Sequence, residues 1–182
     1  MTYLNSNQLK QYSDEGFVSP VNIFSKEKAK EIRDEIELIE KKLPNELEKT
    51  GRYNAHLISP MLDEVTHNEN ILNAVESLIG GNILVCGTTL FIKNPGEGGF
   101  VSYHQDAKYI GLEPHNWVTA WVAITDSNEN NGCMKMWSGS HKDNLKEHDQ
   151  NFNEKNLLTR GQTVNNVPDD QIVPLILNSG QM

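Results

Sequence analysis

The spacing of the apolar residues changes from a helical to a strand-like period at Gly80-Gly81, which favours folds that place helices before strands. Residues 5–15 show helical spacing and stop at Gly16, a residue typical of a helix C-cap. Ser25 is a good N-cap for a second helix, which Pro44 ends because proline cannot continue the helical hydrogen-bond pattern. The first part of the chain is therefore predicted to be helical.

Two of the predicted helices carry an apolar stripe. In the second helix the stripe consists of Ala29, Ile32, Ile36, Ile39 and Leu43. A third helix over residues 69–79 turns five apolar side chains toward a core, namely Ile71, Leu72, Val75, Leu78 and Ile79. Each stripe has to pack on another element of the fold.

Residues after Gly81 are predicted to form β-strands separated by turns. The apolar or β-branched runs cover residues 83–93, 100–106, 117–125, 133–137 and 171–178. Residues 94–99 form a loop, and Asn130-Asn131-Gly132 predicts a hairpin turn because Asn and Gly tolerate positive φ. Residues 144–170 are polar and fit either a long binding loop or a disordered insertion. The sequence thus predicts an α+β fold with a mainly β core.

Length and charge restrict the class of protein further. At 182 residues and 20.5 kDa, the chain has room for one domain, which we place over residues 1–182 with helices in 1–81 and strands in 82–182. The net charge of -9 and the pI near 5.1 argue against a nucleic-acid partner, which requires clustered Lys and Arg. No window approaches the run of about 18 apolar residues that a membrane span needs, and residues 1–16 do not resemble a secretory signal. We therefore expect a cytoplasmic protein with no membrane partner.

The two cysteines are predicted to be buried free thiols. Cys86 and Cys133 lie far apart in apolar or turn settings and form no Cys-x-x-Cys pair. Neither a structural zinc site nor a disulfide framework is expected.

The sequence Tyr103-His104-Gln105-Asp106 is the strongest candidate for a functional site. On a strand, positions two apart project from the same face with Cα atoms roughly 6.5 Å apart, so His104 and Asp106 could bind one metal ion while Gln105 points away. Two His and one carboxylate with open positions are the ligand set of non-haem Fe(II) oxygenases. The pair needs a second His from elsewhere in the chain, and an ordinary surface strand would show the same three residues.

Five short segments together resemble the phytanoyl-CoA dioxygenase family of Fe(II)- and 2-oxoglutarate-dependent oxygenases. They are Leu90-Phe91-Ile92-Lys93, Tyr103-His104-Gln105-Asp106, Val118-Thr119-Ala120-Trp121, Asn131-Gly132-Cys133 and Gly139-Ser140-His141-Lys142, in this order. The likeness extends to Gly16-Phe17-Val18 and to residues 158–162, so it covers most of the chain, whereas Ser138 departs from the Pro that the family has there. The resemblance implies a double-stranded β-helix, a cupin-like jelly roll with N-terminal helices buttressing one sheet, and a barrel that is incomplete at the C-terminus because its final strands are lacking.

The resemblance also implies the roles of individual residues. His104 and Asp106 would be two of the iron ligands, and the third would be a His expected beyond Met182, followed by an Arg that pairs with the far carboxylate of 2-oxoglutarate. Leu90 and Trp121 would line the 2-oxoglutarate pocket, and core packing is the equal alternative for both. The implied cofactors are Fe(II) and 2-oxoglutarate.

The remaining histidines are expected outside the ligand set. His141 fits a structural group in its turn better than a substitute ligand. His56, near Arg52, is expected on the surface, with contact to the cofactor as the alternative for either residue. Loop positions are expected for His67, His115 and His148.

The activity implied by the resemblance is hydroxylation of a small organic substrate with O2. Related halogenases of this fold have a small residue at the carboxylate position so that chloride can bind iron, and the carboxylate of Asp106 therefore favours hydroxylation. Two alternatives stay open, an inactive fragment with two ligands and a non-catalytic jelly-roll module that binds a small molecule. Unpaired sheet edges in an incomplete barrel also predict self-association.

Overall fold

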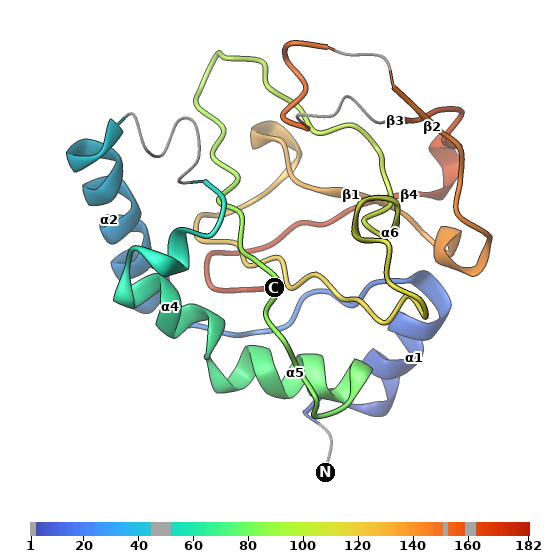
Figure 1. Ribbon diagram of the computed structural model, residues 1–182, viewed down its shortest axis with the longest axis horizontal. Helices are drawn as coiled ribbons and strands as arrows, with labels where there is room; N and C mark the ends of the chain where they lie inside the picture. The colour runs from blue at the N-terminus through green and yellow to red at the C-terminus, as the bar shows by residue number, and fades with distance from the viewer. Residues whose placement is uncertain (1–2, 45–51, 151–152, 159–162) are drawn as a thin grey trace.

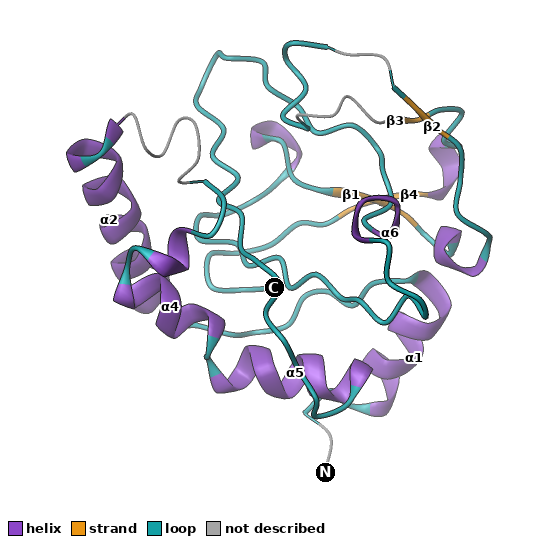
Figure 2. Cartoon of the chain, viewed as in Figure 1, coloured by secondary structure: helices purple, strands orange, loops and turns teal. Residues whose placement is uncertain are grey.

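A computed structural model describes residues 3–44, 52–150, 153–158 and 163–182. Its longer helices follow one another around one side of the molecule, and short strands joined by extended chain lie on the opposite side (Figures 1 and 2). The predicted order of helices before strands is therefore correct.

The first two helices begin and end where the sequence predicts. Helix α1 spans Ser6–Glu15; the Asn5 side chain caps its N-terminus, and Gly16 follows with φ 86° in the left-handed region. Helix α2 spans Lys26–Lys42, with the Ser25 hydroxyl accepting a hydrogen bond from the backbone of Lys28. These caps satisfy backbone groups that the helices themselves leave without partners.

Three further helical segments complete the helical side. The 3₁₀ helix η1 spans Ala55–Leu57, α4 spans Pro60–Thr66 and α5 spans Glu69–Ile79. The Asn68 side chain accepts hydrogen bonds from two backbone N–H groups in the first turn of α5. The helix predicted over residues 69–79 is thus confirmed.

Two apolar clusters form the core that these helices build. The first joins α2 to η1 and α4 and consists of Ile32, Ile36, Ile39, Ala55 and Leu62. The second joins α5 to the chain around residue 22 and consists of Leu4, Val21, Ile23, Ile71 and Ala74. Leu43, predicted as part of the stripe of α2, is exposed because it lies in the C-cap, past the last helical turn.

The regular strands are short and form two antiparallel pairs. Strand β1 (Lys135–Trp137) pairs with β4 (Ile172–Pro174), and β2 (His148–Asp149) pairs with β3 (Thr163–Val164). The same part of the chain contains short helical turns: α6 (Ala107–Ile110), η2 (Glu129–Asn131), η3 (Ser140–Lys142) and η4 (Asp169–Gln171). Within the described residues these strands do not close a barrel.

The long strands predicted over residues 83–93 and 117–125 are wrong as regular strands. In the first segment the ladder is reduced to a single bridge between Tyr53 and Thr89. A strand forms only where a neighbouring segment offers partners along its length, and an apolar run cannot reveal whether such a neighbour is present. The side chain of Leu84 is 90% exposed as a result.

The predicted turn at residues 130–132 exists, but it does not form a hairpin. Gly132 adopts φ 81° directly after η2. The segments on both sides of the turn pair with residues 172–177 instead of with each other, since Ser127 bridges Leu177 and β1 pairs with β4. The two segments thus share one partner strand.

The described part of residues 144–170 packs beside the candidate motif, which agrees with the predicted binding loop and contradicts a disordered insertion for these residues. Phe100 exchanges backbone hydrogen bonds with Lys155 and Leu157, and the N–H of Val164 donates to the carbonyl of Tyr103 over 2.7 Å. Residues 159–162, which include Arg160 of the family-like segment, lie outside the described residues.

The two cysteines differ from each other in burial. Cys133 is buried and free, as predicted, but Cys86 is exposed. Cys86 lies in the weakly paired segment 83–93 beside Leu84 and Val85, which are exposed as well. In the described ranges, none of the helices combines the length and the apolar character that crossing a bilayer requires.

Candidate metal centre

The backbone at the His-x-Asp motif is not the regular strand that the sequence predicts. Phe100 makes one parallel bridge to Asn156, and residues 101–105 continue as extended chain outside any ladder. Asp106 already has helical torsions, φ -56° and ψ -35°, because it is the residue that precedes α6. The alternation of side chains along a strand is therefore not what brings the motif's side chains together.

His104 and Asp106 nevertheless face each other closely. Nε2 of His104 lies 3.2 Å from Oδ1 of Asp106. Two donor atoms that each bind one ion at about 2.1 Å, at a right angle, would lie about 3 Å apart. The observed separation therefore fits two adjacent positions around a single metal ion.

The other ring nitrogen of His104 is held by the backbone. Nδ1 donates a hydrogen bond to the carbonyl oxygen of Ser102 over 2.8 Å, which leaves Nε2 as the atom that faces Asp106. Tyr109 of α6 stands against the imidazole edge to face, with ring centroids 5.9 Å apart. A histidine that binds metal is commonly oriented by such a bond from its second nitrogen.

The two side chains also change each other's proton affinity. Burial lowers the pKa of His104, but the hydrogen bonds to Asp106 and to the Ser102 carbonyl outweigh it, so the pKa lies above its ordinary value. The hydrogen bond from His104 lowers the pKa of the Asp106 carboxyl, against the opposing effect of burial and with support from Thr119. Without metal the pair is thus stabilised as imidazolium and carboxylate.

Thr119 orients the second oxygen of the Asp106 carboxylate. Its hydroxyl donates to Oδ2 over 2.7 Å and accepts a hydrogen bond from the indole N–H of Trp117 over 3.2 Å. Because Trp117 can only donate, the Thr119 proton is directed at the carboxylate. The sequence analysis did not predict the hydrogen bond between Trp117 and Thr119, although a Trp-x-Thr spacing on an extended segment puts the two side chains on one face.

Within the part of the chain that the structure describes, no third ligand accompanies this pair. Among the described residues, no group of three or more His, Cys, Asp or Glu side chains is placed to hold one ion. The donor atoms that the structure brings together are those of His104 and Asp106. They fit two of the three protein positions of a non-haem iron site.

The two residues expected to line the cofactor pocket are both half-buried. Leu90 packs against the core cluster that includes Ile32 and Leu62, and Trp121 precedes the buried Ala123. Half-buried positions of this kind fit core packing and a pocket wall alike.

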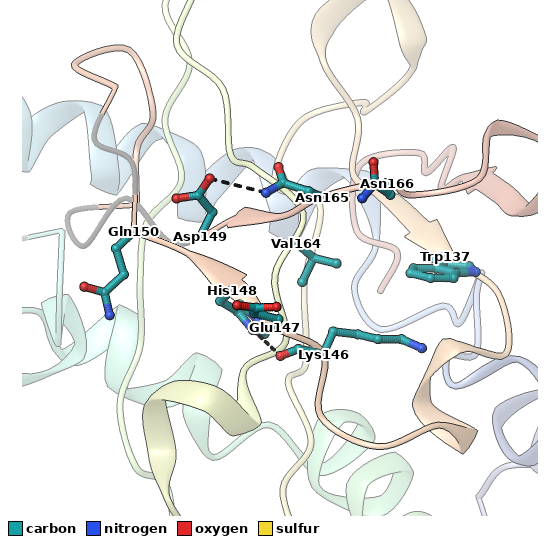
Figure 3. A pocket seen from close by; sticks show the side chains of 9 residues that line it. All are labelled: Trp137, Lys146, Glu147, His148, Asp149, Gln150, Val164, Asn165 and Asn166. Carbon is teal, nitrogen blue, oxygen red and sulfur yellow. Dashed lines mark hydrogen bonds between the residues drawn. The ribbon is translucent and has the colours of Figure 1, made fainter.

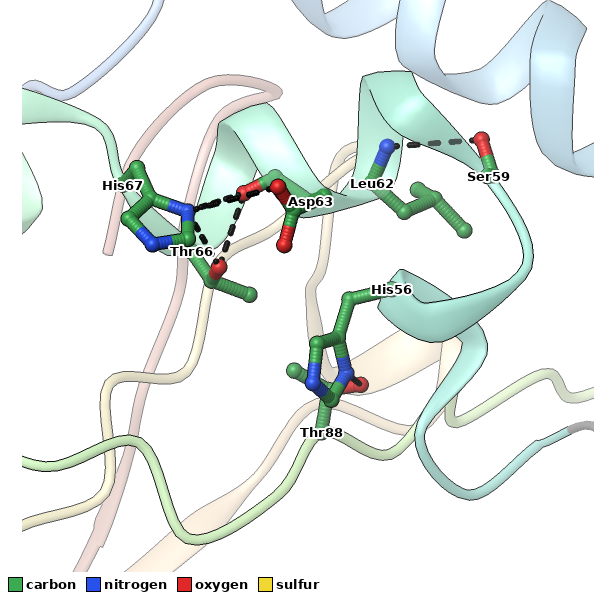
Figure 4. A network of polar contacts seen from close by, with 7 residues as sticks. All are labelled: His56, Ser59, Leu62, Asp63, Thr66, His67 and Thr88. Atoms are coloured by element: carbon green, nitrogen blue, oxygen red, sulfur yellow. Dashed lines mark hydrogen bonds and ion pairs between the residues drawn. The ribbon is translucent and has the colours of Figure 1, made fainter.

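His56 and Arg52 are less exposed than predicted. Nδ1 of His56 makes a 2.8 Å hydrogen bond with the hydroxyl of Thr88 (Figure 4), and the backbone carbonyl of Arg52 accepts from the N–H of Leu90. Both residues thus flank the 88–90 segment. His67 stays at the exposed end of α4, where Nδ1 lies 3.0 Å from the carbonyl oxygen of Asp63.

Two other histidines have structural contacts. His141 donates from Nε2 to the carbonyl of Ser13 over 3.1 Å and packs against Gly16, so it anchors α1, in line with the structural role expected for it. His148, predicted in a loop, is buried in β2 and contacts the backbone of Gln105. No pattern around His148 in the sequence indicates this contact.

Comparison of the amino-acid sequence with known proteins identifies a family and several relatives. The profile of the family described as "Phytanoyl-CoA dioxygenase (PhyH)" matches residues 12–182. The peroxisomal phytanoyl-CoA dioxygenase of Rattus norvegicus is 30% identical over 169 residues, which cover 80% of this chain and 50% of the rat protein. The phytanoyl-CoA dioxygenase domain-containing protein 1 of Danio rerio is 34% identical over 91 residues, 50% of this chain and 31% of that protein. The chain thus spans half or less of the length of these two relatives.

Solved structures agree with this relationship. The non-heme monooxygenase ThoJ in its apo form superposes with a TM-score of 0.78 at 27% identity, over 96% of this chain and 65% of that chain. CytC3 with Fe(II) and alpha-ketoglutarate has a TM-score of 0.61 at 21% identity, over 98% of this chain and 65% of that chain, and shows the shared fold alone. Since the family profile covers nearly the full chain, the protein belongs to the phytanoyl-CoA dioxygenase family.

Proposed function

We propose that this chain carries two of the three protein ligands of an Fe(II)- and 2-oxoglutarate-dependent oxygenase that hydroxylates a small organic substrate. The observation that carries the proposal is the 3.2 Å approach of His104 Nε2 to Asp106 Oδ1, with Nδ1 of the imidazole tied to Ser102. Family membership supports the choice of metal and co-substrate. The third ligand, a histidine, would come from outside the described residues, in the region beyond Met182.

The cofactor pocket would lie beside the ligand pair. We assign Leu90 and Trp121 to its wall, because an aliphatic and an indole side chain together offer a rigid apolar surface with one N–H donor. The complete jelly roll of this family would place both segments around the metal.

When bound, Fe(II) with 2-oxoglutarate would supply the oxidising power to insert oxygen from O2 into a C–H bond. The contribution of this chain would be to hold two donor atoms on one side of the ion. Ser102 and Tyr109 fix the plane of the imidazole, and Thr119 fixes the carboxylate, so that Oδ1 of Asp106 stays directed at the site. As the likeness to halogenases of this fold implies, a carboxylate at position 106 would favour hydroxylation over chlorination.

Metal binding by the 182-residue chain tests the assignment directly. Equilibrium dialysis with Co(II), a spectroscopically visible substitute for Fe(II), should detect one site per chain. Asp106→Ala and His104→Ala should each weaken it by more than roughly 100-fold, since changes to groups behind the ligands alone cost roughly 10- to 100-fold. His115→Ala, in an exposed loop, is the matched control and should bind as the wild type does.

The alternatives give different results in the same experiment. Co(II) bound equally by all variants would refute the site. A chain that takes up no Co(II) but binds a small molecule in the presence of a chelator would instead be a non-catalytic binding module. Fe(II) binding without 2-oxoglutarate consumption, even when the third histidine ligand is supplied, would identify an inactive protein.

A further inference from the structure

His148 is buried and reaches the candidate metal centre from a segment 43 residues away. It is 8% exposed, although it belongs to the short strand β2. Its Nε2 lies 3.0 Å from the backbone nitrogen of Gln105, the residue between the two ligands. Its Nδ1 lies 2.8 Å from the carbonyl oxygen of Lys146 (Figure 3).

The partners of the ring determine its protonation pattern. The Lys146 carbonyl can only accept a hydrogen bond, so Nδ1 has to carry the proton. The Gln105 N–H can only donate, so Nε2 has to present its lone pair. Both ring nitrogens of His148 are therefore in use, and the residue cannot act as the third metal ligand without breaking one of these bonds.

Two further contacts hold residues 103–105 in place. The side-chain oxygen of Gln105 accepts a hydrogen bond from the backbone N–H of Lys146 over 2.7 Å. Val164, which pairs with His148 across β2 and β3, donates its N–H to the carbonyl of Tyr103 over 2.7 Å. The backbone of residues 103–105 is thus held by residues 146–148 and 164.

This support matters because residues 101–105 have no ladder of their own. The torsion angles at Gln105 determine how the imidazole of His104 is directed relative to the carboxylate of Asp106. A rotation of the Gln105 peptide would separate the two donor atoms, and metal sites tolerate displacements of only about 0.5 Å. A hydrogen bond to the Gln105 N–H is therefore well placed to preserve the 3.2 Å approach.

We propose that His148 is a positioning residue for the metal centre, which fixes the Gln105 peptide so that His104 and Asp106 converge on one ion. The inference rests on the proposed function of that pair. It assigns His148 no contact with metal or substrate. Its effect passes through the backbone between the two ligands.

Two substitutions at position 148 separate this role from simple packing. In His148→Gln the side-chain oxygen extends about as far as Nε2, so it can still accept from Gln105. In His148→Asn the polar group reaches only about as far as Nδ1, so it can satisfy the Lys146 carbonyl but not the Gln105 N–H. The measurements are Co(II) affinity by dialysis, the visible Co(II) spectrum, and amide hydrogen exchange at Gln105.

His148→Asn should weaken Co(II) binding by roughly 10- to 100-fold, alter the visible spectrum and expose the Gln105 amide to exchange. His148→Gln should restore all three toward the wild type. His141→Asn is the matched control, because it removes another imidazole bond to a backbone carbonyl, that of Ser13, away from the site. It should lower thermal stability without changing the Co(II) spectrum.

A folded His148→Asn variant with wild-type Co(II) affinity and an exposed Gln105 amide would overturn the proposal. If that variant does not fold, His148→Gln decides, since weakened Co(II) binding with a protected Gln105 amide would also overturn it. A wild-type chain that binds no Co(II) would refute the proposed function instead. The positioning role would then be judged without metal, from the ¹⁵N resonance of His104 Nε2, which must shift in His148→Asn if the Asp106 contact depends on His148.

Discussion

Gly180 lies so close to the backbone of Phe24 that a Cβ at position 180 would be 2.4 Å from the Phe24 carbonyl oxygen. The carbonyl of Gly180 accepts hydrogen bonds from the N–H groups of both Ile23 and Phe24, over 3.0 and 2.9 Å. Its φ of 89° adds a second requirement for glycine. Close approach and positive φ thus coincide where residues 23–24 meet the C-terminal segment.

Gly180→Ala is therefore expected to destabilise the chain strongly. The strain of positive φ and the overlap with a backbone atom should together lower the free energy of unfolding by about 2–5 kcal/mol, measured by urea denaturation. Gly96→Ala is the matched control, because Gly96 has φ 83° but no atom within 4 Å of the position that the alanine methyl group would occupy. Equal losses in the two variants would show that the close approach to Phe24 has no energetic effect.

Removal of the Thr119 hydroxyl should loosen the Asp106 carboxylate. Thr119→Val keeps the shape of the side chain but loses the donor to Oδ2, so Co(II) affinity should fall by about 10-fold, the low end for groups behind a ligand, because Thr119 is exposed. Thr119→Ser keeps the hydroxyl and should bind nearly as the wild type does. Isothermal titration with Co(II) measures both, and similar affinities in the Val and Ser variants would contradict this role.

Trp121 should affect the co-substrate and not the metal. We expect Trp121→Ala to weaken 2-oxoglutarate binding to the Co(II)-loaded chain while leaving Co(II) affinity unchanged, because an indole in the pocket wall contacts the co-substrate without ligating the ion. Trp137→Ala, on β1, serves as the control for loss of an indole elsewhere. Chelation of the Co(II) should abolish 2-oxoglutarate binding in all variants, and binding that survives chelation would indicate a different pocket.

The exposed apolar residues of segment 83–93 should promote self-association. Leu84 and Phe91 both lie on the surface there, and unpaired extended chain offers hydrogen-bonding groups to a second copy. Leu84→Lys should therefore reduce the apparent mass at high concentration in size-exclusion chromatography with light scattering. Leu57→Lys, at an exposed position in η1, should have less effect. A wild-type chain that remains monomeric at all concentrations would contradict this expectation.

Helices α1, α2 and α5 could be predicted because their determinants are local in the sequence, whereas α4 was not predicted. Asn5, Ser25 and Asn68 cap helices from positions adjacent to them, and Gly16 ends α1 through its own torsion angles. The pattern of apolar residues in α2 needs no knowledge of its partner to be recognised. The boundaries were therefore correct to within about a residue.

The strands could not be predicted in the same way because their partners are distant. Ser127 pairs with Leu177, and Tyr53 with Thr89, so the alternation in each apolar run is no guide to which run has a neighbour. The burial predicted for Cys86 was wrong for the same reason. The local pattern in residues 83–93 predicted extended chain, but it could not predict whether other segments would bury that chain.

In the candidate site, the two candidate ligands could be predicted from the sequence, but the contacts that hold them could not. His104 and Asp106 were recognised from their spacing and family likeness, although the helical torsions of Asp106 mean that the expected strand geometry does not bring them together. Thr119 and His148 reach the pair from 13 residues beyond Asp106 and 43 residues beyond Gln105, by contacts that depend on the tertiary fold. Contacts of this kind leave no periodic signal in the sequence.

The pairing of Val21 with Met182 sets the earliest point during synthesis at which the backbone of residues 21–24 can find its partners. The two residues exchange backbone hydrogen bonds of 2.9 and 2.8 Å, and Val21 belongs to the same apolar cluster as Ile71 of α5. At roughly 5–20 residues per second, residue 182 leaves the ribosome on the order of ten seconds after residue 21. During this interval the cluster of α2, η1 and α4 can form, because all of its residues have already been made. The backbone groups of residues 21–24 that later bond to residues 180–182 have no partner there yet. A chain that begins to fold during synthesis would therefore expose the edge of residues 21–24 for that interval, before its partner segment is made.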